Sequence, residues 1–155
     1  MIDYTAALTA LTGHLKQGTG KPVVLENQSA TQPAYPFCTY SIPSPYLPQR
    51  TDYIGEHMDE VVEFVVSLTW HSKSNIEALA LAQRSVELLK TIGARQVLGD
   101  DGLTVVRIDG FTNRDTFLTI DTERRYGFDV RLRTLTRTTG ELDAIDTVEL
   151  NNTII

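Results

Sequence analysis

The segment from Tyr126 to Arg133 alternates apolar and polar side chains without a break. Its apolar side consists of Tyr126, Phe128, Val130 and Leu132. A period of two with aromatic and β-branched residues predicts a strand that rests one face on a hydrophobic core. The opposite side carries Asp129, Arg131 and Arg133, and Arg137 continues it. A guanidinium group forms paired hydrogen bonds with carboxylates and phosphates. The arginine side therefore indicates either a surface for a partner or a solvated face without one.

Other strands are predicted by the same reasoning. Residues 60–71 form the clearest one, with Phe64 and Trp70 on its apolar side and therefore in the core together with Phe128. Shorter strands are predicted at 23–25, 35–42, 103–109, 116–121 and 126–136. Pro43, Pro45 and Pro48 exclude a helix or a central strand, so residues 43–48 are expected to be extended and residues 49–58 a polar loop.

Two helices are predicted. The first covers residues 3–17, with Asp3 as its N-cap. The second begins at Ser74, which forms a capping-box pattern with Glu77, and is expected to stop at Gly93. This order of elements favours an α+β fold, a mostly antiparallel sheet with two helices packed on one face. The other face of the sheet is only half apolar, so another molecule is expected to cover it.

The 155 residues correspond to one domain, placed at 1–137, followed by an acidic C-terminal extension or arm at 138–155. Seven arginines face five acids between Arg107 and Arg137, whereas residues 138–155 contain four acids and no lysine or arginine. This contrast predicts self-complementarity, either within one chain or between copies. The net charge of -6 argues against non-specific binding to nucleic acid.

Catalytic, metal-binding and cofactor-binding motifs are not recognisable. His14, His57 and His71 lack metal-ligand spacing, and there is no GxSxG or GxxxxGK. Cys38 paired with a histidine could form the nucleophile of a small enzyme, but a lone cysteine in a strand is usually a small buried group. No catalytic residue, metal or cofactor is therefore predicted. With one cysteine, no run of about 18 apolar residues and no secretory signal, we expect a cytoplasmic protein rather than a membrane protein.

Two short runs resemble a known family. Glu-Arg-Arg-Tyr-Gly-Phe-Asp-Val at 123–130 is similar to the C-terminal strand signature of phage neck and tail terminator proteins. Tyr-Pro-Phe-Cys-Thr-Tyr at 35–40 is similar to the Tyr-Pro-aromatic strand of that family, and the order of elements matches over roughly residues 3–137. The resemblance implies a small α+β sandwich without catalysis or cofactor. It also implies a ring of six copies that stops tail-tube polymerisation, faces the head-side connector and lets genomic DNA pass.

The resemblance also implies where contacts lie. Candidates for intersubunit or tube contacts are Arg124, Arg125, Arg131, Arg133 and Arg137, with Glu123 pairing with an arginine across the interface. For Arg124 and Arg125 the alternative is pairing with Asp121 or Glu123 inside a turn. Tyr46 and Leu47 are candidate partner contacts because they are apolar residues in a segment expected to be exposed.

The expected partners are further copies of the chain, the tail tube protein, the head-tail connector and, transiently, DNA, in a virion assembled in the host cytoplasm. The alternatives are a head-tail connector protein and a soluble bacterial interaction or adaptor module.

Overall fold

The sheet contains five strands in the order β1-β2-β3-β5-β4. The computed structural model describes residues 1–27 and 29–140. Its elements are α1 (Tyr4–Thr19), β1 (Val23–Leu25), β2 (Phe37–Ile54), β3 (His57–Ser72), α2 (Asn75–Lys90), α3 (Ile92–Asp100), β4 (Thr104–Asn113) and β5 (Arg124–Thr139). Among the strands of these described residues, only the β1–β2 pair is parallel; β3 pairs antiparallel with both β2 and β5, and β4 pairs antiparallel with β5. The predicted α+β class is confirmed.

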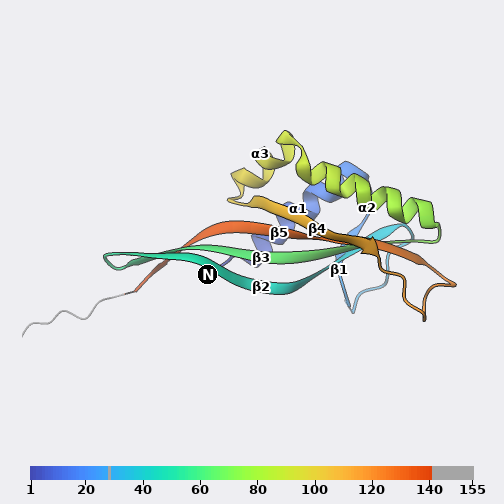
Figure 1. Ribbon diagram of the computed structural model, residues 1–155, viewed down its shortest axis with the longest axis horizontal. Coiled ribbons are helices and arrows are strands. Elements are labelled where there is room, and N and C mark those ends of the chain that lie inside the picture. Colours follow the sequence, from blue (N-terminus) through green and yellow to red (C-terminus); the bar gives the residue numbers. More distant parts are fainter. Residues whose placement is uncertain (28, 141–155) are drawn as a thin grey trace, which may run out of the picture.

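All three helices lie on the same face of this sheet (Figure 1). The core between the layers contains Phe64, Trp70 and Phe128, each fully buried as predicted. The indole Nε1 of Trp70 donates to Ser85 Oγ of α2 at 2.8 Å, so the largest core residue keeps its polar atom paired. The prediction of two helices missed α3, which covers the inner side of β4 (Figure 1).

The helix starts agree with the sequence, but one helix end does not. Asp3 accepts a hydrogen bond from the backbone of Ala6, and Ser74 accepts one from Glu77. α2 ends at Lys90, and Gly93, its expected stop, lies inside α3. The reason is Thr91, whose extended backbone breaks the helix and whose hydroxyl caps the backbone of Ala94 at 3.1 Å.

The predicted loop at 49–58 is wrong. β2 continues through Pro43, Pro45 and Pro48 to Ile54 and turns back into β3 at Gly55, where φ is 59°. Beyond Tyr40, β2 pairs only with β3, so its outer edge does not require the missing N–H groups. Residues 49–61 and 135–139 form a three-stranded arm that projects past the helices at the left of Figure 1.

The predicted strand at 116–121 is also wrong. β4 runs to Asn113, and the β4–β5 loop (residues 114–123) follows at the opposite end of the molecule from the arm (Figure 1). Its backbone bonds are local, from Ile120 N to Thr116 O at 3.0 Å and from Glu123 N to Thr119 O at 2.8 Å. Local turns replace the ladder because Thr116 and Thr119 bond to each other and none of the described strands lies alongside them. The predicted extension is described only to Gly140; residues 141–155 lie outside the described residues.

Candidate functional site

The sheet face opposite the helices, which we call the open face, is polar and carries paired charges. β3 contributes Val61, Glu63, Val65, Ser67 and Thr69, and β5 contributes Gly127, Asp129, Arg131, Arg133 and Leu135. No helix of the described residues lies over this face (Figure 1). That another molecule covers it stays a prediction.

Glu63 is the centre of the open face. The register places it opposite Arg133, one row away from Arg131. Arg131 Nε donates to Oε1 at 2.5 Å and Arg133 Nε to Oε2 at 2.8 Å. The Glu63 side chain is 4% exposed, against 25% for Arg131 and 47% for Arg133. Burial alone would raise the pKa of Glu63, but the hydrogen bonds from Arg133 and Arg131 lower it below its usual range.

Arg114 crosses the open face as a strap from the β4–β5 loop. Its Nη1 donates to Ser67 Oγ at 2.6 Å and to Thr69 Oγ1 at 3.0 Å, both on β3. Its Nη2 donates to Asp129 of β5 at 3.1 Å. The side chain passes over Gly127, where a Cβ would lie 2.9 Å from Arg114 Cδ. One arginine therefore joins the loop to two strands.

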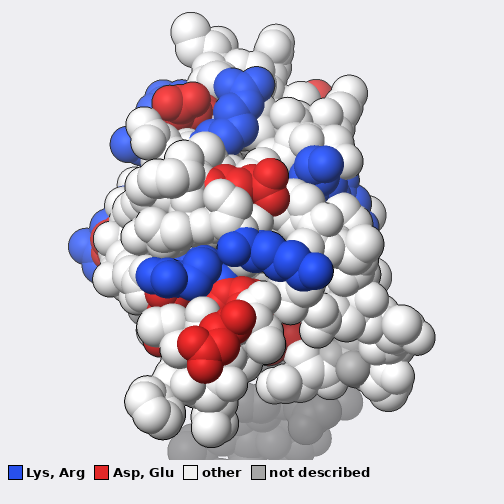
Figure 2. All heavy atoms as spheres, turned by 90° about the vertical axis from the view of Figure 1, so that its right-hand side faces the viewer, with Lys and Arg blue, Asp and Glu red and all other residues white. Residues whose placement is uncertain are grey.

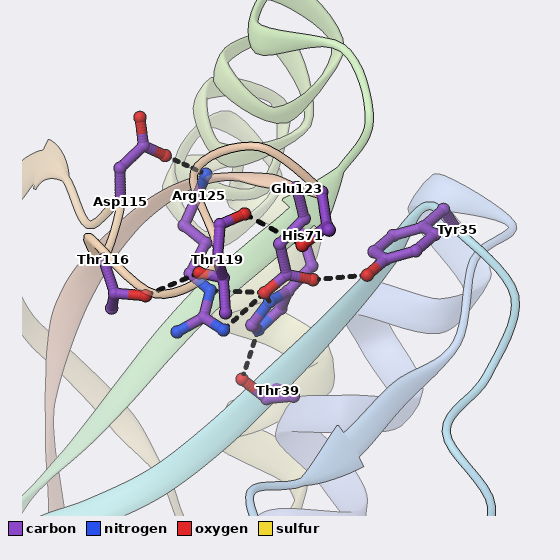
Figure 3. Close-up of polar contacts among 9 residues, drawn as sticks. Tyr35, Thr39, His71, Asp115, Thr116, Thr119, Glu123 and Arg125 are labelled. Atoms are coloured by element: carbon purple, nitrogen blue, oxygen red, sulfur yellow. Dashed lines mark hydrogen bonds and ion pairs between the residues drawn. The ribbon is translucent and has the colours of Figure 1, made fainter.

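A second charge cluster is buried where the β4–β5 loop returns to the sheet. Glu123 Oε2 accepts from the Tyr35 hydroxyl at 2.7 Å, and Oε1 lies 3.1 Å from His71 Nδ1 (Figure 3). Arg125 Nε donates to the same Oε1 at 2.6 Å. Burial would raise the pKa of Glu123, but the hydrogen bonds from Tyr35, Arg125 and His71 outweigh it and lower that pKa. The carboxylate holds the segment before β2, β3 and β5 together.

His71 is neutral in this setting. Burial lowers its pKa and outweighs the opposing hydrogen bond to Glu123. Its Nε2 lies 2.9 Å from Thr39 Oγ1, and its ring stacks on Phe37 with centroids 4.7 Å apart. Nδ1–H then donates to Glu123 while Nε2 accepts from the Thr39 hydroxyl. A hollow of about 320 Å³ opens beside His71, Glu123 and Arg125, but those groups already satisfy one another.

The predicted contact residues do not form one patch. Arg131 and Arg133 lie mid-sheet, and Arg137 lies on the arm, where it pairs with Asp59 at 2.7 Å. Glu123, Arg124 and Arg125 lie at the other end of β5. Figure 2 looks onto that end and shows basic and acidic side chains next to each other rather than in separate patches. The three groups are distinct sites on the subunit.

Pairing inside the chain, one of the two alternatives for the turn arginines, is what the structure contains. Arg125 pairs with Glu123 as expected in that alternative, and Arg124 pairs with Asp115 at 2.8 Å instead of Asp121. Glu123 accordingly has its arginine within the same chain. Their part in contacts between chains stays a prediction.

Tyr46 and Leu47 lie on β2 instead of a loop. Tyr46 is 52% exposed and its hydroxyl donates to Glu60 Oε1 at 2.6 Å. Leu47 is half-buried and stands opposite Glu63 in the strand register. Their role in partner contact stays a prediction.

The sequence does not reveal the acidic partners of the arginines. The alternation of apolar and polar residues along 60–71 places Glu63 on the mixed face of that strand and does not identify its partners. The sequence also predicts neither the Arg114–Asp129 pair nor the His71–Glu123 pair. Alternation identifies which face a residue occupies, but the register between distant strands decides which residues meet.

Metal ligation and thiol chemistry find little support. Within residues 1–27 and 29–140 no group of three or more His, Cys, Asp or Glu side chains could hold a metal ion. Cys38 is fully buried, and burial raises the pKa of its thiol. The described helices include none with the length and apolar character needed to cross a membrane.

The comparison with protein families decides the identity. A family model described as phage neck terminator protein matches residues 5–155. The chain belongs to the phage neck terminator family. The predicted resemblance to this family is thereby confirmed, and the match includes the acidic stretch after residue 137. No curated protein matches the chain.

Membership in this family makes the protein a structural component of the phage neck. A neck terminator is part of the virion and associates with other proteins of the head and tail. Its function therefore depends on the surfaces that meet those proteins.

Proposed function

We propose that this neck terminator works as a homohexameric ring that caps the tail tube and joins it to the head-side connector. Genomic DNA passes through its lumen, and the chemistry is recognition without catalysis. The family match supports the place in the neck. The observation that supports the joining role is that two parts of the subunit, the arm and the β4–β5 loop, carry exposed apolar side chains. These two parts lie at opposite ends of the long axis (Figure 1).

The first end is the arm. Tyr53 is 78% exposed, Ile54 61% and Leu135 66%. Tyr53 and Ile54 are the last residues of β2 before the hairpin turn, and Leu135 lies farther from the tip on β5, opposite Val61. Exposed apolar groups on a projecting element are typical of a protein–protein contact. We assign this end to one axial partner, the tail tube or the connector.

The second end is the β4–β5 loop. Phe117 and Leu118 are 95% and 92% exposed, and Ile120 is 40% exposed. Two consecutive large apolar residues with almost no intrachain contact contribute nothing to the core and favour a role in docking. We assign this end to the other axial partner.

A ring also requires contacts between neighbouring copies. A closed ring uses a head-to-tail interface in which two different surfaces of one subunit meet. The open face, which lies between the two apolar ends, is one such surface. A net charge of -6 is compatible with a DNA conduit, since a strongly basic lumen would retain DNA through its phosphates.

Negative-stain electron microscopy tests the proposal directly. The purified full chain is imaged alone and after mixing with tail tubes that lack their terminator. We expect six-fold rings in the first sample or a cap at one end of each tube in the second. A compact monomer that never decorates tube ends contradicts the proposal and favours a soluble interaction module.

A further inference from the structure

The open face presents guanidinium groups to its surroundings and keeps its central carboxylate underneath. Glu63 is 4% exposed, whereas Arg131, Arg133 and Arg107 are 25%, 47% and 61% exposed. Arg107 stands opposite Arg131 on the neighbouring strand β4. Arg107 pairs with the exposed carboxylate of Asp109 at 3.1 Å, whereas the carboxylate that pairs with Arg131 and Arg133 is buried. A molecule that approaches the centre of this face therefore meets Arg131 and Arg133 first.

The two central arginines have hydrogen-bonding capacity left over. A guanidinium group carries five N–H donors. One carboxylate cannot neutralise the charge of two guanidinium groups. Arg131 bonds to Glu63 through Nε, and Arg133 does so through Nε and Nη2. In residues 1–27 and 29–140 no other acceptor engages these two side chains. Glu63 thus fixes both guanidinium groups in place and leaves a surplus of one positive charge, which suits a carboxylate-bearing ligand.

The chain itself contains a matching segment. Residues 141–155 carry Glu141, Asp143, Asp146 and Glu149 and no lysine or arginine. Fifteen residues span at most about 50 Å when extended. The segment starts at the arm, because the N–H of Gly140 bonds to the carbonyl of Glu56 at 3.0 Å. Its length therefore allows it to extend well beyond the subunit's own arm.

The direction of β5 favours an adjacent subunit over the same one. The strand runs from Arg131 through Arg133 to Thr139, so the chain leaves the sheet heading away from its own arginines. Thr139 lies six positions after Arg133, which is about 20 Å of strand. A return to the same face would need a reversal followed by that distance, whereas a neighbour in a ring can accept the segment directly.

We propose that the open face around Arg131 and Arg133 binds residues 141–155 of the next copy of the chain in the ring. The inference rests on the proposed ring function and names its intersubunit contact. It supplies the two different surfaces that a head-to-tail ring needs, one basic and one acidic. It also explains why the arginines and the acids are separated along the sequence.

Photo-cross-linking of the full chain tests the contact. Benzoylphenylalanine replaces Ile145, and ¹⁵N-labelled and unlabelled chains are mixed one to one under ring-forming conditions. We expect cross-linked peptides that join residue 145 of one isotope to residues 61–67 or 127–135 of the other. The matched control places benzoylphenylalanine at Ile92, which is 83% exposed on the helix side and should not label these peptides.

Charge reversal gives a second readout. The variant E141K/D143K/D146K/E149K should dissociate from rings at least tenfold more readily, and raising the salt concentration should reduce the difference from wild type. Cross-links within one isotope only, or to other surfaces, overturn the inference. A reversed variant that forms normal rings also overturns it and leaves the proposed function intact.

Two further outcomes would contradict the inference in different ways. If Arg133→Gln lowers the affinity for a fluorescent DNA duplex while the reversed variant assembles normally, the face binds phosphate and the inference is wrong. If neither rings nor tube caps form under any condition, the inference and the proposed function both fail.

Discussion

Gly127 lies directly beneath the side chain of Arg114. A Cβ at Gly127 would lie 2.9 Å from Arg114 Cδ and 2.3 Å from the carbonyl oxygen of Leu68. The missing side chain thus lets the arginine strap cross β5 and bond to β3. The glycine within the Arg-Tyr-Gly-Phe run is required by this crossing.

Gly127→Ala should therefore destabilise the fold. The obstructing atom is a backbone oxygen that cannot move aside, so we expect a loss of about 2–3 kcal/mol in the free energy of unfolding. Urea unfolding measures it. The control is Gly13→Ala in α1, where nothing lies within 4 Å of the added Cβ and helix propensity favours alanine. Equal stability of Gly127→Ala and wild type would contradict the close approach of Leu68 and Arg114 to Gly127.

Removing the buried carboxylate of the open face should also be costly. Glu63→Gln leaves two adjacent guanidinium groups without a counter-charge, and we expect a loss of about 2–4 kcal/mol. Arg131→Gln should cost more than Arg133→Gln, since Arg131 is 25% exposed and Arg133 47%. Thermal unfolding of the three variants gives the order. Glu87→Gln serves as control, because its pair with Arg84 is exposed and 4.0 Å apart.

Stability should fall in two stages as the pH is lowered. The pKa of His71 lies below 6.5 in the folded chain, so the unfolded chain takes up the proton first. This contribution is fully present above about pH 6.5 and decreases as the pH falls toward the folded pKa. Among the groups near His71, Glu123 and Glu26 oppose this shift and Arg125 supports it.

The second stage belongs to the carboxylates. The pKa values of Glu63 and Glu123 are lowered from 4.5, so their contribution is present above that pH and is lost below it. Melting temperatures between pH 8 and pH 3 should show both stages, and His71→Gln should remove the first. A flat profile between pH 7 and pH 5 would contradict the neutral assignment of His71.

Cys38 should resist thiol reagents in the native protein. It is fully buried and burial raises the pKa of its thiol, so little thiolate is available. We expect Ellman's reagent to react only after unfolding in guanidinium chloride. The Cys38→Ala variant should still form rings or caps. That result would exclude the hypothesis that the function depends on a catalytic Cys38 thiol. Rapid labelling of the native chain would refute the buried placement.

The β4–β5 loop should contribute to docking and not to folding. Phe117→Ser combined with Leu118→Ser removes side chains that are 95% and 92% exposed, so stability should change by less than about 0.5 kcal/mol. Binding to tube ends or to the connector should weaken at least tenfold in a pull-down titration. Ile92→Ser removes another exposed apolar residue and should leave binding unchanged. Unaltered binding of the loop variant would exclude this loop as a contact.

Much of the sheet could be predicted because the alternation of apolar and polar residues along a strand indicates which side chains are buried. The apolar sides of 60–71 and 126–133 are the buried sides in the structure, and Phe64, Trp70 and Phe128 lie in the core. Asp3 and Ser74 were identifiable because each caps a helix with its own side chain. These features depend on residues that are close together in the sequence, so they can be predicted without knowledge of the tertiary structure.

The pairing of charges could not be predicted because it depends on long-range register. Glu63 and Arg133 are 70 residues apart, with two helices and a strand between them. A shift of two residues in the register would give each arginine another neighbour while preserving the alternation. The long β2 was missed because three prolines are compatible with a strand only when that strand lacks a neighbour on one side.

The prolines of β2 have a consequence for a subunit that we propose caps the tail tube. Pro43, Pro45 and Pro48 lie on β2 beyond its last pairing with β1, where an ordinary strand would offer free N–H groups to any passing chain. Proline has no N–H group, so this edge of the sheet is a poor template for the addition of further strands. A subunit that caps the tail tube, as we propose, is thereby kept from nucleating an uncontrolled assembly of its own.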